Sequence, residues 1–134
     1  MKYWNNLENT IFFNKVFTHL IEIGEITLFN ITIDNDRPNI GLGFDIPELP
    51  DSPPDKWLRE GFNSCRIGLD CGGLSDVKIS NVPTGEPLKM AISKHENFYE
   101  LRAESNTSLI EFKAKYISLC GPSVYFNDPD SACY

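Results

Sequence analysis

Short runs in which apolar and polar residues alternate, each closed by turn-forming residues, limit most strongly how this chain can fold. In the clearest run, Ile40, Leu42 and Phe44 share one parity, while Gly41 and Gly43 occupy the other. Because successive side chains of a strand point to opposite faces, such a run predicts a strand with one buried face. The predicted strands cover residues 26–33, 40–46, 65–71, 77–79, 88–92, 98–103 and 110–116.

This spacing of strands and turns is typical of an antiparallel meander that closes into a sandwich or a partly open barrel. We therefore expect a mainly β fold, α+β at the margin, with one or two short helices. A chain of 134 residues closes around one core, so residues 1–134 are taken as a single domain. The polar segment 127–134 offers little to bury and is expected to fray.

The first two predicted strands form a hairpin. Phe29, Ile31 and Ile33 alternate with polar residues, so we expect their side chains on the buried face. The turn Asp34–Pro38 supplies turn formers and a proline that cannot donate to a ladder, which ends the strand. The segment Gly41–Gly43 is too short for a nucleotide-binding fingerprint and indicates close packing of backbone.

A short helix is expected before the first strand, over Asn9–Phe17, with Asn9 as its cap. Its apolar residues near helical spacing are Ile11, Phe12, Val16 and Leu20. Aromatic and β-branched residues make this helix intrinsically weak. It must therefore be held by packing against the sheet.

The proline-rich connection Leu49–Phe62 joins the hairpin to the third predicted strand. Ser52 can cap a second helix over Pro53–Glu60, which starts at the prolines. The helix dipole favours Asp55 in the first turn, Arg59 at the end and Gly61 just past it. We expect Trp57 to fold back over an open end of the sheet and to act, with Pro53 and Pro54, as a structural anchor. Recognition of a partner is the alternative role of this tryptophan.

The net charge of −7 comes from acidic residues scattered along the whole chain. Solubility is its simplest explanation, and electrostatic steering of a basic partner is the alternative. Binding to nucleic acid is not expected, because it needs a basic face. The N-terminus does not resemble a signal peptide, and no run approaches the ~20 apolar residues of a membrane span. We therefore expect a cytoplasmic protein that does not associate with membranes.

Residues that could carry chemistry are sparse. Cys65 and Cys71 lie on the predicted buried parity of their strand, so we expect free thiols that pack as small apolar groups. His19 and His95 lie far apart, with no further ligands at metal-binding spacing. No nucleophile elbow, phosphate-binding loop or dinucleotide fingerprint is present. We therefore expect no catalytic residues, no metal site, no cofactor and no enzyme activity.

One segment is specific enough to suggest a family: Pro53–Trp57, read as Pro-Pro-Asp-Lys-Trp between two strands. The elements that accompany it in order are Tyr3-Trp4, the strand Ile26–Ile33, the turn Asp34–Pro38, the strand Ile40–Ile46, Gly61-Phe62-Asn63 and the strand Leu74–Ile79. This order resembles the immunity protein 50 family of bacterial polymorphic toxin systems, from about Tyr3 to Phe126. The segment His19–Gly24 departs from the family pattern, which has a Gly-x-Pro-Ser-Leu-like segment before the first strand.

The resemblance implies a cytoplasmic, non-enzymatic antidote that binds one cognate toxin domain and blocks its active site or its folding. It is expected to act as a monomer or homodimer. Many toxin domains are nucleases with basic grooves, and an acidic inhibitor can imitate phosphate there. The candidate partner-binding residues are carboxylates around the first hairpin and its exit, namely Asp34, Asp36, Asp45, Glu48, Asp51 and Asp55.

Two other classes of function stay open. A β-rich module that binds a small ligand needs an apolar cavity lined from several strands. A structural or regulatory subunit needs an exposed apolar patch or an unpaired edge strand. A large toxin gene immediately upstream, ending in a small C-terminal domain, would decide for the immunity function.

Overall fold

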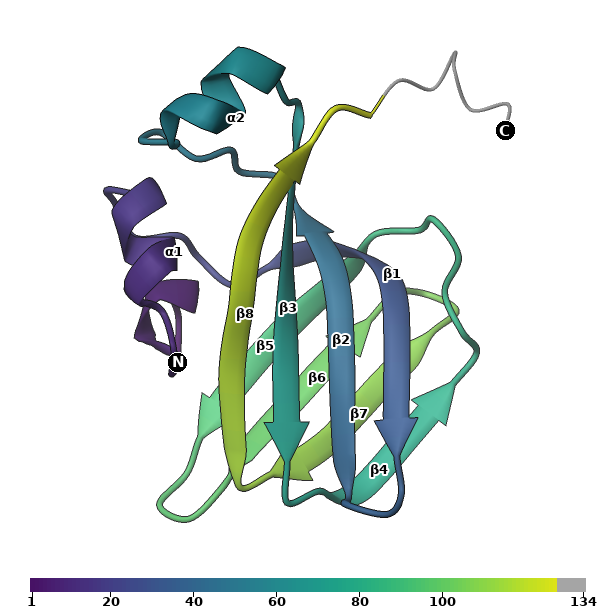
Figure 1. Cartoon of the computed structure of the whole chain (residues 1–134). Coiled ribbons are helices and arrows are strands. Elements are labelled where there is room, and N and C mark those ends of the chain that lie inside the picture. The colour runs from purple at the N-terminus through teal and green to yellow at the C-terminus, as the bar shows by residue number, and fades with distance from the viewer. Residues whose placement is uncertain (128–134) are drawn as a thin grey trace.

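Eight antiparallel strands form one open sheet that curls into two layers (Figure 1). The structure is a computed structural model that describes residues 1–127. The strands are β1 (Glu25–Asp34), β2 (Asn39–Ile46), β3 (Ser64–Gly72), β4 (Ser75–Ser80), β5 (Leu88–Lys94), β6 (Tyr99–Glu104), β7 (Leu109–Ala114) and β8 (Tyr116–Tyr125). Their order in the sheet is β4-β7-β6-β5-β1-β2-β3-β8. The mainly β fold, a partly open sandwich with two short helices, is confirmed.

Strand β1 joins the two layers because it belongs to both. Glu25 and Ile26 pair with β5, whereas the rest of the strand, from Thr27 to Asp34, pairs with β2. One layer therefore contains β8, β3, β2 and most of β1, and the other contains β5, β6, β7 and β4 (Figure 1). Strands β1 to β3 pair in sequence order, and so do strands β5 to β7. Strand β4 pairs with β7 at one edge of the sheet, and β8 pairs with β3 at the other edge.

A single hydrophobic core lies between the layers. The apolar residues of β2 are buried as predicted, and the ring of Phe44 lies 5.3 Å from the ring of Trp4. Cys65 and Cys71 are buried free thiols, which confirms that prediction. Burial raises the pKa of each thiol to about 12. Both therefore pack as neutral, unreactive groups.

The predicted buried face of β1 is wrong at Phe29 and Ile33. Phe29 is 50% exposed and Ile33 57% exposed, whereas Ile26 and Leu28 are buried. At Phe29 the cause is a β-bulge, because the pairing with β2 shifts between Leu28 and Asn30 and leaves Phe29 as an extra residue. Beyond the bulge, Ile33 pairs with the buried Ile40 and so has the inward parity, but it lies at the rim of the core beside Val82 and Pro83, where it stays exposed. The bulge reverses which parity of the strand faces inward, and the alternation of apolar and polar residues does not indicate it.

Helix α1 (Ile11–Val16) follows a single 3₁₀ turn, η1 (Trp4–Asn6), and lies beside β8 (Figure 1). The predicted cap at Asn9 is wrong. Thr10 is the N-cap residue, while Asn9 has a φ of 63° and donates its side-chain amide to the carbonyl of Leu119. The predicted inward face is wrong at Ile11, Phe12 and Leu20, which are exposed. Val16 is buried as predicted, and Phe13 and Phe17 are buried with it, at spacings of three and four residues.

Helix α2 (Asp55–Glu60) lies in the proline-rich connection. Asp55 in its first turn, Arg59 in its last turn and Gly61 at its C-cap, with a φ of 76°, lie as predicted, and the helix ends at Glu60 as predicted. It begins at Asp55, two residues after the predicted start at Pro53. The predicted cap at Ser52 is wrong, because Pro54 is the N-cap residue and no side chain caps the helix. The backbone N–H of Ser52 donates instead to the carbonyl of Val16, which ties the connection to α1.

Strand β8 has no counterpart among the predicted strands. The last predicted strand ran to Tyr116, whereas β7 ends at Ala114 and β8 starts a new strand at Tyr116. No glycine or proline marks the break at Lys115, whose N–H donates to the carbonyl of Gly72. The predicted frayed tail, 127–134, lies outside the described residues beyond Asn127.

Candidate functional site

The outer face of β1, β2, β3 and β8 is built mostly from small residues, and we call it the glycine face. Its residues have the parity opposite to the buried ones and stand in register across the four strands. Its four cross-strand rows are Thr27-Asp45-Arg66-Ser123, Asn30-Gly43-Gly68-Cys120, Thr32-Gly41-Asp70-Ser118 and Asp34-Asn39-Gly72-Tyr116. The glycines leave the middle of this face almost bare of side chains.

Aromatic rings cover two of these glycines. A Cβ atom at Gly43 would lie 2.7 Å from Cζ of Phe29, the bulged residue of β1. A Cβ atom at Gly72 would collide with the ring of Tyr116. The absence of a side chain at these two positions therefore lets each ring lie flat on the sheet.

Gly41 has no such cover. The nearest atom to a Cβ built there is Cβ of Thr32, at 3.8 Å, which is an ordinary van der Waals contact. Glycine in a strand interior loses more entropy on folding than alanine and packs nothing, and it often marks a place where another molecule or backbone approaches closely. Packing within the described residues does not account for glycine at this position.

Arg66 forms the most elaborate cluster on the glycine face. Its Cζ lies 3.6 Å from the ring centre of Phe29 and 4.5 Å from that of Tyr125, so the guanidinium is stacked between two rings. Its Nε donates to Asp45 at 3.0 Å, and the Tyr125 hydroxyl donates to the other oxygen of the same carboxylate. Burial and this hydrogen bond raise the pKa of Tyr125. The cluster is preorganised and its single positive charge is neutralised.

The other charges of the glycine face are negative. Asp70 accepts one hydrogen bond from the side-chain amide of Asn39 at 2.7 Å. Asp34 accepts bonds from the backbone N–H groups of Asp36 and Arg37 through Oδ1, which closes the turn of the hairpin. In both carboxylates Oδ2 has no partner among residues 1–127.

The outer face of β4, β5, β6 and β7 is of the opposite kind, and we call it the ion-pair face. Arg102 donates to Glu111 at 2.9 Å and to Glu104 at 3.1 Å. Lysines and glutamates oppose each other across the other rows, so that Lys78, Lys89, Arg102 and Lys113 stand among Glu100, Glu104 and Glu111. Charges on this face neutralise one another within the molecule.

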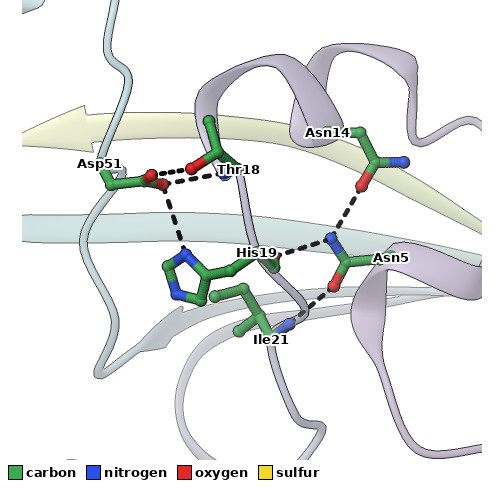
Figure 2. A network of polar contacts seen from close by, with 6 residues as sticks. All are labelled: Asn5, Asn14, Thr18, His19, Ile21 and Asp51. Carbon is green, nitrogen blue, oxygen red and sulfur yellow. Dashed lines mark hydrogen bonds and ion pairs between the residues drawn. The ribbon is translucent and has the colours of Figure 1, made fainter.

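A polar network at the helical end ties the N-terminal segment to the proline-rich connection (Figure 2). Asp51 accepts hydrogen bonds from the hydroxyl and the backbone N–H of Thr18. These bonds lower the pKa of Asp51, and His19 lies 3.6 Å from the carboxylate. On the other side of His19, the side chain of Asn5 bonds Asn14, the His19 carbonyl and the N–H of Ile21 (Figure 2). The network is structural, because each of its members bonds another part of the same chain.

The family model described as immunity protein 50 matches residues 9–125, which is most of the chain. The chain belongs to the immunity protein 50 family. The matched region includes all eight strands and both α-helices. No curated protein and no solved structure matches the chain.

In this immunity protein 50 domain the six predicted partner-binding carboxylates do not form one cluster. Asp34 and Asp36 lie at the β1–β2 turn, and Asp45 lies on the glycine face. Glu48, Asp51 and Asp55 follow the other end of β2. The eight residues of that strand separate the two groups by roughly 26 Å, at about 3.3 Å per residue.

The bonds of these carboxylates sort them further. Asp34, Asp45 and Asp51 accept hydrogen bonds from their own chain, as described above. Glu48 is half-buried, and burial raises its pKa. The side chains of Asp36 and Asp55 are exposed and have no partner among residues 1–127.

The three predicted anchor residues lie at the helical end of the domain. Trp57 is partly buried against the core, and its ring meets that of Phe12 edge-on at 5.6 Å. Pro53 and Pro54 are half-buried beside it. Trp57 therefore joins α2 to α1 as well as to the sheet, and its role as anchor stays a prediction.

The glycine face was missed by sequence reasoning, although part of its signal was visible. Gly41 and Gly43 stood on the outward parity of a regular strand, and Gly68 has the same parity in β3. What the sequence could not supply was the register that places these glycines side by side. Within residues 1–127, no group of three or more His, Cys, Asp or Glu side chains could hold a metal ion, and no helix is long and apolar enough to cross a membrane.

Proposed function

We propose that this protein binds one cognate toxin domain and neutralises it in the cytoplasm of the cell that produces both. The observation that carries the proposal is the match to the immunity protein 50 family over residues 9–125. Neutralisation requires a stable complex, and the compact core with its preorganised outer faces supports rigid-body binding at low entropic cost. The protein acts by binding rather than by catalysis.

The charge of the chain favours a basic partner. A net charge of −7 gives long-range attraction to a positively charged toxin domain, which raises the association rate. A nuclease with a basic substrate groove is such a domain, because that groove is built to attract phosphate. We accordingly include a basic nuclease in the proposal as the first class of toxin to test.

We also propose that the carboxylates of the first hairpin and its exit meet this partner. Asp36 and Asp55 support the proposal best, since both are exposed and have no partner among the described residues. Asp34, Asp45, Glu48 and Asp51 complete the proposed set, although three of them also bond their own chain. Rim charges of this kind act mainly on the association rate.

Co-expression tests the proposal directly. Cells that express the C-terminal domain of a toxin encoded beside the gene of this protein should survive only when this protein is present. The same protein should give no protection against an unrelated toxin domain. Failure to protect against, and to bind, any neighbouring toxin domain would contradict the immunity function. Replacing Asp36 and Asp55 by lysine tests the carboxylates separately, and the expected result is slower association with a weaker dependence on salt.

A further inference from the structure

The glycine face is a flat area large enough to be the core of a protein interface. Four strands about 4.8 Å apart and four rows about 6.6 Å apart cover roughly 500 Å². Each partner in a typical complex buries about 800 Å². The face alone therefore covers more than half of the area that one partner of a specific interface buries, which is the share expected of an interface core.

Its chemistry is that of an interface core rather than of a solvated sheet. Lysine and glutamate are absent from its four rows, while arginine and tyrosine, the residues that dominate interface energetics, are present as Arg66 and Tyr116. Phe29 and Tyr125 add two aromatic rings that hold Arg66 in place before any partner arrives. A rigid aromatic and arginine cluster loses little entropy on binding.

Gly41 supplies an independent argument. It occupies the interior of a central strand, and there is room for a methyl group above it. A residue larger than glycine would stabilise the isolated domain, so its absence is explained by something outside the domain that comes close to the backbone. Gly68 lies diagonally from Gly41 on β3, opposite Gly43, and carries no side chain either.

Charge selects the partner that can approach. The glycine face carries three negative charges, at Asp34, Asp45 and Asp70, and one positive charge, at Arg66. The nearby turn adds Asp36 and Arg37, whose opposite charges cancel. The face is thus negative, which disfavours a second copy of this chain and disfavours nucleic acid. It suits a basic protein surface whose lysines or arginines reach the free Oδ2 atoms of Asp34 and Asp70.

We infer that the glycine face is the surface on which the toxin domain docks, with a flat basic surface of the toxin lying over Gly41 and Gly68. This inference rests on the proposed function, and it names the surface that performs it. The ion-pair face, whose charges are already paired within the chain, stays exposed in the complex.

Matched substitutions on the two faces test the inference. Gly41→Val adds a β-branched side chain to the centre of the glycine face, and Ala91→Val places the same side chain, by adding two methyl groups, at an exposed position of β5 on the ion-pair face. Binding is measured by calorimetry with the inactivated C-terminal domain of a toxin encoded beside the gene of this protein. Gly41→Val should weaken binding at least tenfold, while Ala91→Val should change it less than twofold. The melting temperature of each variant is measured to verify that it is folded.

A second pair of substitutions probes the charges of the two faces. It also keeps the inference testable if a variant of the first pair does not fold. Asp70→Lys should weaken binding at least tenfold, and Glu104→Lys on the ion-pair face should leave it within twofold. If Gly41→Val does not fold, Gly41→Ala, which adds only the methyl group, replaces it and should weaken binding threefold or more. Wild-type affinity in folded Gly41 and Asp70 variants would overturn the inference while leaving the immunity function intact. A wild-type protein that binds no neighbouring toxin domain would overturn both.

Discussion

The two outer faces of the sandwich obey the same strand alternation and have opposite chemistry. On the ion-pair face, Arg102 satisfies Glu104 and Glu111, and the lysines stand opposite glutamates. On the glycine face, charges are few and the middle carries few side chains. A face whose charges are paired within the chain is suited to exposure to solvent. A bare, mildly acidic face with a fixed aromatic cluster is suited to contact with another protein surface.

The difference shows where functional information lies in a β-sandwich. Both inner faces are alike, because each supplies apolar residues to one core. The outer faces are free of that requirement, so their composition reflects solubility on one side and, on our proposal, recognition on the other.

Among the substitutions, Trp57→Ala should have the largest effect on stability, and it should spare both faces. The side chain is partly buried and contacts Phe12 edge-on, so its loss should cost about 2 kcal/mol of unfolding free energy, less than for a fully buried tryptophan. Chemical denaturation measures this change. Toxin affinity at a temperature where the variant is folded should stay unchanged, and a folded variant with normal stability that no longer binds toxin would show that Trp57 is a recognition residue.

Arg66→Ala should come next, with a cost of about 1.5 kcal/mol. The substitution removes the stacked guanidinium and leaves Asp45 with only Tyr125 as a partner. Arg102→Ala on the ion-pair face is the control and should leave the melting temperature nearly unchanged, because its ion pairs are exposed. Equal losses of stability in the two variants would contradict the distinction between the preorganised Arg66 cluster and the solvated ion pairs of the ion-pair face.

The inward thiols of β3 predict a loss of stability at alkaline pH. Cys65 and Cys71 have pKa values of about 12 in the folded chain, against an ordinary value near 8.5 for a free cysteine. Between these values the unfolded chain loses protons that the folded chain keeps, so stability falls as pH rises above about 9. The expected loss is about 2 kcal/mol per thiol at pH 10. Thermal melts from pH 8 to 10.5 measure it, and the Cys65→Ala/Cys71→Ala variant should show a shallower slope.

Gly43→Ala should have the smallest effect on stability, about 0.5 kcal/mol, because the new methyl group displaces the exposed ring of Phe29 from its place over Arg66. Gly24→Ala is a matched control, since a Cβ there meets nothing within 4 Å. The control should be neutral or slightly stabilising. A Gly43 variant as stable as this control would show that the ring does not contribute to the fold.

Most of the fold could be predicted from sequence because alternation and turn residues act locally. The buried residues of β2, the thiols of β3 and the C-terminal end of α2 all followed from such local rules. The bulge at Phe29 and the break at Lys115 could not be predicted, because pairing with distant strands determines them. The predicted carboxylates were close in sequence but were divided between the two ends of β2, since an extended strand moves its neighbours apart.

Cys120 offers the most direct test of the central claim, because this exposed thiol lies on the glycine face beside Gly68. In a Cys133→Ser variant, the rate of Cys120 alkylation is measured by mass spectrometry in the free protein and with saturating inactivated toxin domain. Cys65 and Cys71 are buried and should stay unmodified in both samples. We predict that the toxin domain slows alkylation of Cys120 at least tenfold. An unchanged rate in a fully formed complex would contradict the claim that the toxin covers this face.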